Sequence, residues 1–259
     1  MLCSSVITNL SYADSNQAIS KPSAEDNLAH QRSLYHDALE LARQGKWQRL
    51  KQHREQLQSY PLYPYLVYAD LASNLRYSRR SEVSQYLEDY SGSIKARHLR
   101  NHWLNYLAKR QYWSTFIRFY APQQASIKQQ CQFQLARYYA DPKDPQLDKR
   151  RAQALSAALK LWNVGKSQPK QCDRLFNRLI ADNRITEALA WQRFNKALIN
   201  HQYQLARYLQ RFIKTPYYSQ LAKLYYQADR SPENIGQFQH FTNDSAEELL
   251  IIQHALVHL

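Results

Sequence analysis

The stretch Leu107-Ala108-Lys109-Arg110-Gln111-Tyr112-Trp113 contains the unit from which this chain is built. One apolar helical pattern ends in it, a short polar turn follows, and an aromatic residue then opens the next helix and can pack back on the previous one. Residues 180–185 and 198–203 have the same form. Repeated units of helix, short turn and helix indicate stacked helical hairpins. The sequence therefore predicts an α-solenoid of tetratricopeptide-like style, without a strict repeat consensus.

The composition favours an all-α fold without a sheet. Leu, Ala, Gln, Arg and Lys dominate the 259 residues, and β-branched residues are few. Only 4 residues are glycine, which leaves little material for phosphate-binding loops and argues against Rossmann and P-loop enzymes. The mean hydropathy is −0.70, and no apolar run reaches the roughly 18 to 20 residues of a membrane span. We expect a soluble protein with no transmembrane segment.

The positive charge is concentrated in two segments that contain no acidic residue. The chain has 35 Lys and Arg against 21 Asp and Glu, a net charge of +14. Residues 91–140 and 188–228 contain 8 and 6 of these bases, which together equal the whole net charge. Such segments favour a polyanionic partner, although solvated helix faces would give the same pattern. The candidate anion-binding residues are Arg97, Arg100, Lys109, Arg110, Arg118, Arg193, Arg207 and Arg211.

The sequence shows no motif for catalysis, a cofactor or a metal. The His98/His102 and His254/His258 pairs have the spacing that places two imidazoles on one helix face, but Arg97 and Arg100 oppose a cation at the first pair. No GxSxG motif is present. Tyr residues beside Arg, as in residues 118–120 and 137–139, could stack on bases or sugar rings, but core packing is the simpler interpretation.

The N-terminus and the cysteines suggest export. Residues 1–13 have the form of the end of a secretory signal peptide, with a short apolar stretch followed by small residues. We expect that the signal begins upstream of Met1 and that residues 14–23 are flexible. Removal of Cys3 with the signal leaves Cys131 and Cys172, which suit one disulfide in an oxidising compartment. Two free thiols in a cytosolic protein are the alternative.

Several segments resemble the N-terminal superhelical domain of the soluble lytic murein transglycosylases. They are YPLYPYLVY at 60–68, RNHWLNYLAKRQYW at 100–113, LWNVGKSQP at 161–169 and CDRLF at 172–176. The similarity extends over about residues 34–209. It implies a disulfide between Cys131 and Cys172, location in the periplasm, and one superhelical domain over residues 24–259. A helix predicted from Asp244 onward still runs at the last two residues, so we expect the domain to be truncated there.

The resemblance also implies a role. Enzymes of this family cleave the β-1,4 bond between N-acetylmuramic acid and N-acetylglucosamine with one glutamate, which a serine follows, and leave 1,6-anhydromuramic ends. No glutamate of this chain precedes a serine, and GLMQ-type and AYNAG-type segments are missing. The resemblance thus implies a non-catalytic scaffold, inactive alone, that positions the absent lysozyme-like domain and binds glycan strands. Cell-wall synthases are further expected partners.

Two other classes of function compete with this interpretation. A helical-repeat binder of nucleic acid would explain the net charge and the interleaved aromatic residues, although export argues against it. A scaffold for protein partners would explain the solenoid alone.

Overall fold

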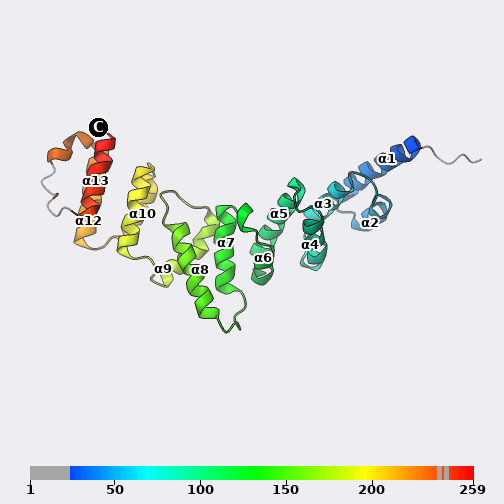
Figure 1. The fold of residues 1–259 in the computed structure, drawn as a ribbon, viewed down its shortest axis with the longest axis horizontal. Helices are drawn as coiled ribbons and strands as arrows, with labels where there is room; N and C mark the ends of the chain where they lie inside the picture. The colour runs from blue at the N-terminus through cyan, green and yellow to red at the C-terminus, as the bar shows by residue number, and fades with distance from the viewer. Residues whose placement is uncertain (1–23, 238–240, 242–244) are drawn as a thin grey trace, which may run out of the picture. The chain divides into compact units, whose positions relative to one another are not determined.

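In a computed structural model of the chain, residues 24–237, 241 and 245–259 are described, and every regular element among them is helical (Figure 1). Thirteen α-helices and five short 3-10 helices follow one another, and this part of the chain contains no strand. The all-α prediction is confirmed. None of the described helices combines the length and the apolar character needed to cross a membrane. The predicted signal remnant and the segment 14–23 lie outside the described residues.

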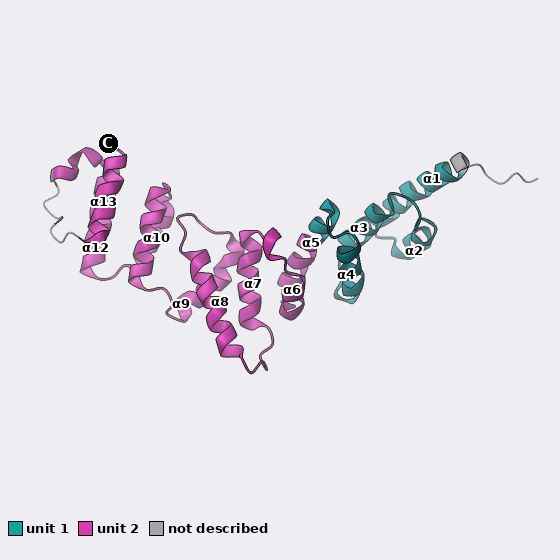
Figure 2. Ribbon diagram, viewed as in Figure 1, with its two compact units in different colours: residues 1–99 teal, residues 100–259 magenta. Residues whose placement is uncertain are grey.

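The chain divides into two compact units, residues 1–99 and residues 100–259 (Figure 2). The boundary falls within helix α5 (Ile94–Arg110). The sequence predicts a single superhelical domain over residues 24–259, and that boundary stays a prediction.

Unit 1 is built around α1 (Ala24–Arg43), which packs on both α2 (Trp47–Gln56) and α3 (Tyr63–Ser73). The apolar stripe of α1 supplies Tyr35 and Ala38 to a core that Leu50 and Leu66 complete. Pro64 lies in the first turn of α3, where the missing proline N–H has no intrahelical partner to lose. The 3-10 helix η1 (Tyr77–Arg79) and α4 (Arg80–Asp89) follow.

Unit 2 consists of consecutive packed helices. The first group is α6 (Trp113–Phe119), η2 (Pro122–Gln124), α7 (Ile127–Tyr139), α8 (Leu147–Trp162), η3 (Lys170–Cys172) and α9 (Asp173–Ala181). The second group is α10 (Glu187–Ile199), α11 (Tyr203–Leu209), η4 (Gln210–Phe212), α12 (Pro216–Arg230), η5 (Pro232–Gln237) and α13 (Ala246–Val257). Within them α7 packs on α8 and α12 on α13, as hairpins do (Figure 1). Helix α10 packs on α11 in the same way. The predicted hairpin architecture is therefore present in this unit.

The three turns that predicted the fold share one backbone conformation. Gln111, Asn183 and His201 follow the ends of α5, α9 and α10 with φ of 59°, 50° and 53°. In each turn, the N–H of the next residue donates to a carbonyl five residues back, as in Tyr112 to Leu107 at 3.0 Å. This is the Schellman helix ending, which most often has glycine at the left-handed position. The chain forms it three times in unit 2 without glycine.

The loop between α8 and α9 is fixed at both ends. Cys131 on α7 forms a disulfide with Cys172 in η3, with an S–S distance of 2.10 Å, so the pairing implied by the family resemblance is present. Gly165 is buried, and a Cβ at this position would lie 2.2 Å from the carbonyl oxygen of Lys196. Only glycine lets the loop approach α10 this closely.

Helix α13 is shorter than the sequence predicts. Its Ser245 cap accepts a hydrogen bond from the Glu248 N–H in a capping box, as the polar start of this segment suggests. The helix ends at Val257, and the N–H of the following residue, His258, closes a tighter turn onto the carbonyl of Ala255.

Candidate functional site

The eight candidate basic residues lie in different environments. Six of them are exposed, whereas Arg100 is half-buried and Arg193 is buried. Arg97 belongs to unit 1 and the other seven belong to unit 2. The exposed residues are Arg97, Lys109, Arg110, Arg118, Arg207 and Arg211.

Three of the candidates pack on nearby side chains of unit 2. Arg100 donates from Nη1 to Oε1 of Gln124 at 3.3 Å. The guanidinium carbon of Arg110 lies 5.8 Å from the Tyr106 ring centroid, and that of Arg211 lies 5.2 Å from the ring of Tyr208. Their charged ends stay near aromatic faces, where a sugar or an anion can reach them.

Arg207 is part of a basic groove, which we call the α11–α12 groove. The groove has a volume of about 740 Å³. Its lining residues are Tyr203, Arg207, Gln210, Lys223, Tyr226, Gln227, Asp229 and Arg230. The spacing of three and four residues within α11 and within α12 puts these side chains on one face of each helix. The structure therefore joins a predicted residue to two bases, Lys223 and Arg230, that were not candidates.

The one acidic residue in the lining of the α11–α12 groove, Asp229, is bonded to a histidine. Oδ1 of Asp229 lies 2.7 Å from Nε2 of His254 on α13, and both side chains are less than a tenth exposed. Burial and the Asp229 carboxylate raise the pKa of Tyr203, so its phenol stays protonated at neutral pH. Arg207, Lys223 and Arg230 form no ion pair with any described residue. The groove thus presents three cations to solvent with no exposed acid among them.

The chemistry of the α11–α12 groove suits a ligand that carries hydroxyls and negative charges. Tyr203 is 47% exposed, so its ring offers a flat apolar face to a sugar ring. Gln210 and Gln227 can both donate and accept hydrogen bonds with hydroxyl groups. The groove offers binding groups, and its one carboxyl group, that of Asp229, is engaged by His254.

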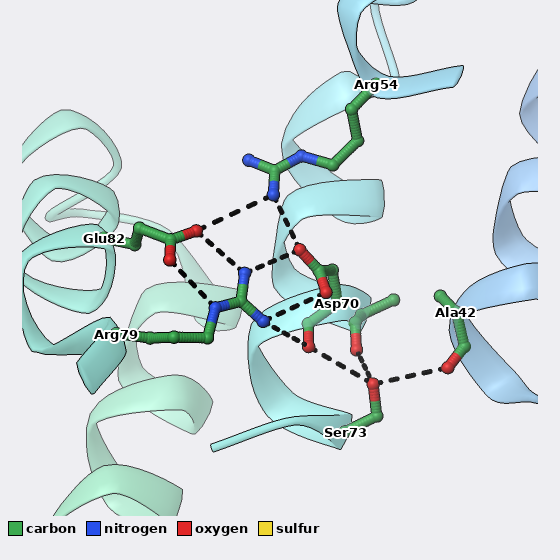
Figure 3. Close-up of polar contacts among 7 residues, drawn as sticks. Ala42, Arg54, Asp70, Ser73, Arg79 and Glu82 are labelled. Carbon is green, nitrogen blue, oxygen red and sulfur yellow. Dashed lines mark hydrogen bonds and ion pairs between the residues drawn. The ribbon is translucent and has the colours of Figure 1, made fainter. Parts of the chain in front are cut away.

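A second groove, in unit 1, contains charged residues that the sequence analysis missed. Trp47 and Tyr63 line it together with Arg54, Asp70, Arg79 and Glu82, and its volume is about 510 Å³. Figure 3 shows both guanidinium groups pointing toward the carboxylates. Asp70 is buried and accepts hydrogen bonds from Arg54 at 2.6 Å and from Arg79 at 2.7 and 3.1 Å. We call these four charged residues the Asp70 network.

The Asp70 network is closed on itself. Glu82 accepts two hydrogen bonds from Arg79, at 2.9 and 2.8 Å, and these bonds lower the pKa of Glu82. A carboxyl group that stays ionised cannot donate the proton that glycosidic cleavage requires. The pKa of Arg79 is raised, because its bonds to Glu82 and Asp70 outweigh the effect of its burial. This arrangement holds helices together rather than performing acid catalysis.

The two histidine pairs lie in different surroundings. His98 and His102 are exposed on α5. His254 is bonded to Asp229, and its ring centroid lies 4.5 Å from that of His258. Within the described residues, no group of three or more His, Cys, Asp or Glu side chains is placed to hold a metal ion.

Comparison with known proteins confirms the family resemblance. No family model matches the chain. It is 30% identical over 159 residues to the soluble lytic murein transglycosylase of Escherichia coli K12, and 30% identical over 152 residues to that of Salmonella typhimurium. The chain spans only 23% and 22% of the length of these relatives, and the matches cover 61% and 59% of the chain.

Solved structures agree with the helical fold. The lytic transglycosylase Slt of Pseudomonas aeruginosa, as an inactive mutant, is 28% identical with a TM-score of 0.70 over 86% of this chain and 35% of its own. The 70 kDa soluble lytic transglycosylase of Escherichia coli is 23% identical with a TM-score of 0.68, over 89% of this chain and 36% of its own. The same kind of enzyme in complex with bulgecin A gives a TM-score of 0.67 at 22% identity.

Proposed function

We propose that this chain is the non-catalytic helical part of a lytic murein transglycosylase and that it binds peptidoglycan glycan strands in the periplasm. The similarity to soluble lytic murein transglycosylases supports a role in peptidoglycan turnover. In this role the helices position a lysozyme-like domain that cleaves the bond between N-acetylmuramic acid and N-acetylglucosamine. The chain itself contributes binding and no catalytic residue.

The α11–α12 groove is the observation that carries the binding role. A glycan strand presents hydroxyl groups together with the carboxylates of its lactyl and peptide substituents. The groove matches both features, since Arg207, Lys223 and Arg230 face no competing acid and Tyr203 offers an exposed ring. Opposite charge at a groove also raises the rate at which a polyanion is captured.

The disulfide supports the proposed location in the periplasm. Cys131 and Cys172 are fully buried and bonded to each other. Structural disulfides persist in oxidising compartments such as the periplasm and are rare in the cytosol.

Binding to isolated sacculi tests the proposal. The triple variant Arg207→Gln, Lys223→Gln, Arg230→Gln should bind about tenfold more weakly than the parent chain, because three exposed ionic contacts each contribute up to about 1 kcal/mol. The matched control is Lys143→Gln, Lys149→Gln, Lys170→Gln, which removes the same charge from exposed positions outside the groove. Equal losses in both variants would contradict a specific site and indicate attraction by net charge alone.

Binding to nucleic acid is the second candidate function, because the net charge is +14. Phosphate binding weakens steeply with salt, by several powers of ten for a protein with many phosphate contacts. If the chain binds glycan rather than nucleic acid, the purified protein should show a low ratio of absorbance at 260 nm to that at 280 nm. It should also keep its affinity for sacculi. Tightly bound RNA, with no affinity for sacculi, would replace the proposed function with this one.

A further inference from the structure

Arg193 is a buried cation without a carboxylate partner. It lies on α10, is 3% exposed, and forms no ion pair with any described residue. Its Nε donates to the carbonyl oxygen of Val164 at 3.2 Å. The other two guanidinium nitrogens make no hydrogen bond within the described part of the chain. Burial lowers the pKa of Arg193 to about 10, which still leaves the side chain charged at neutral pH.

Two aromatic rings hold the guanidinium in place. Its central carbon lies 4.5 Å from the ring centroid of Trp162 and 6.0 Å from that of Phe176. These contacts, and the carbonyl beyond the end of α8, offset part of the cost of burying the charge. They leave the two terminal nitrogens without a hydrogen-bond acceptor among the described residues. The guanidinium is therefore held in one orientation while these nitrogens can still donate to a ligand.

Arg193 lines a second groove of unit 2, which we call the Arg193 groove. Its volume is about 510 Å³, and Trp162, Phe176, Asp173, Gln204 and Tyr208 are among the lining residues. Arg193 and Asp173 are the only charged residues in the lining. Asp173 is exposed at the start of α9 and, within the described residues, has no ion-pair partner.

The two charges select the chemistry of a ligand. A guanidinium fork with two free nitrogens matches the two oxygens of a carboxylate. Asp173 would repel a phosphate, which carries more negative charge, but it can accept hydrogen bonds from an ammonium group. A ligand with one carboxylate and one ammonium therefore matches both charged residues of the groove, and the amide of Gln204 can bond to a peptide group.

We propose that the Arg193 groove binds the zwitterionic amino-acid end of a peptidoglycan stem peptide, with the carboxylate on Arg193 and the ammonium on Asp173. The inference rests on the proposed function, because it takes peptidoglycan as the partner. It assigns a peptide-binding site distinct from the α11–α12 groove, which is assigned to the glycan strand. Gln204 and Tyr208 belong to one groove, whereas Tyr203 and Arg207 belong to the other, so the short helix α11 contributes to both.

Calorimetry of the full chain with three soluble probes tests the proposal. The probes are muropeptides with a free amine and carboxylate, the same muropeptides acetylated at the amine, and glycan strands stripped of their peptides by an amidase. Arg193→Gln should weaken binding of the free muropeptide about tenfold to a hundredfold, because it removes charge-assisted hydrogen bonds. Its affinity for the bare glycan should be unchanged.

Asp173→Asn provides a test that leaves Arg193 in place. This variant should bind the free muropeptide about threefold to tenfold more weakly, as expected for a partly exposed ionic contact, and should bind the acetylated muropeptide as the parent chain does. Asp148→Asn is the matched control, since Asp148 is another exposed acid in a first helical turn and lies outside the groove. It should change neither affinity.

The outcomes separate the two proposals. If Arg193 only anchors the loop at Val164, Arg193→Gln lowers the melting temperature, and the parent chain binds free and acetylated muropeptides equally; that equality would overturn the inference even if the variant fails to fold. Free alanine competing as strongly as the muropeptide would also overturn it. If the parent chain does not bind the bare glycan, that result would count against the proposed function alone.

Discussion

Two arginines of unit 1 and two of unit 2 have the same chemistry and opposite surroundings. In unit 1, Arg54 and Arg79 are bonded to Asp70 and Glu82, so both positive charges are neutralised within the fold (Figure 3). In unit 2, Arg193 and Arg207 have no carboxylate partner among the described residues, yet each lines a groove. The difference teaches that net charge alone does not distinguish an arginine that is neutralised within the fold from one whose charge remains available at a groove.

The energetic consequences of the two arrangements differ. A buried carboxylate is tolerated only when its charge is compensated, and Asp70 has two arginines that do so. An unpaired base at a groove contributes little to folding, so its removal should leave the fold intact. Loss of a partner in unit 1 should thus affect stability, and loss of a base in the α11–α12 groove should affect binding.

The largest expected effect is that of Asp70→Ala. It removes the buried carboxylate that Arg54 and Arg79 share and leaves only the exposed Glu82 to pair with them. Breaking one partner of a buried pair costs about 3 to 5 kcal/mol. Urea unfolding of the full chain measures this loss. The control Asp37→Ala removes an exposed acid of α1 and should change the free energy of unfolding by less than about 0.5 kcal/mol. Equal effects of the two variants would remove the distinction between network and surface.

The disulfide gives the corresponding test in unit 2. The double variant Cys131→Ala, Cys172→Ala opens a loop of sequence separation 41. The chain-entropy relation for such a loop predicts a loss of about 4 kcal/mol. Hydrogen exchange should become faster in α7 to α9 and stay unchanged in α1 to α3. Uniform acceleration in both units would show that they unfold as one.

A smaller effect is expected on the pH dependence of stability, to which one carboxylate in each unit contributes. Folding lowers the pKa of Glu82, so the stability it contributes is complete above its unfolded pKa of about 4.3 and is lost as the pH falls through the lower folded value. Glu82→Gln should therefore be less stable than the parent at pH 7 and should lose less stability on acidification. Melting curves between about pH 3 and 7 measure both.

Glu187 is the counterpart in unit 2. Desolvation raises its pKa, but hydrogen bonds from the backbone N–H groups of Thr215 and Lys214 outweigh that effect, and the pKa is lowered overall. Glu187→Gln, like Glu82→Gln, should lose less stability than the parent chain as the pH falls. An acid profile identical to that of the parent in both variants would contradict the assigned contacts.

The smallest expected effect concerns the turns. Unit 1 has Gly45 at the left-handed position after α1, whereas unit 2 has Gln111, Asn183 and His201 at theirs. Gln111→Gly should stabilise the chain by about 0.5 to 1 kcal/mol, because a side chain at positive φ is strained. Asn183→Gly should gain less, since asparagine tolerates this conformation. Thermal unfolding ranks the two, and a loss of stability in Gln111→Gly would show that its side chain matters more than the backbone strain.

Much of the fold could be predicted from local sequence patterns. Helices and their turns depend on residues three to five positions apart, and the quoted stretch at 107–113 already contains the helix end, the left-handed turn and the next helix start. The Asp70 network could not be found in this way. Its bonds join residues 16 and 9 positions apart, on separate elements.

The sites were only partly predictable. Arg193 was a candidate because it lies in an acid-free segment, but its burial was not predicted. Helical spacing could have revealed the burial, because Arg193 lies on the buried stripe of α10 between Ala190 and Ala197. Arg230 was excluded because Asp229 ends the acid-free segment. The His254 side chain from α13 engages that acid, and a contact across 25 residues is invisible to local composition.

Hydrogen exchange with and without soluble glycan strands tests the central contrast most directly. Saturating bare glycan should slow exchange in residues 203–230, the segment that contains the lining of the α11–α12 groove. It should leave residues 54–82, the segment that contains the Asp70 network, unchanged. Protection of residues 54–82, or none at residues 203–230, would contradict the assignment of paired arginines to folding and unpaired bases to binding.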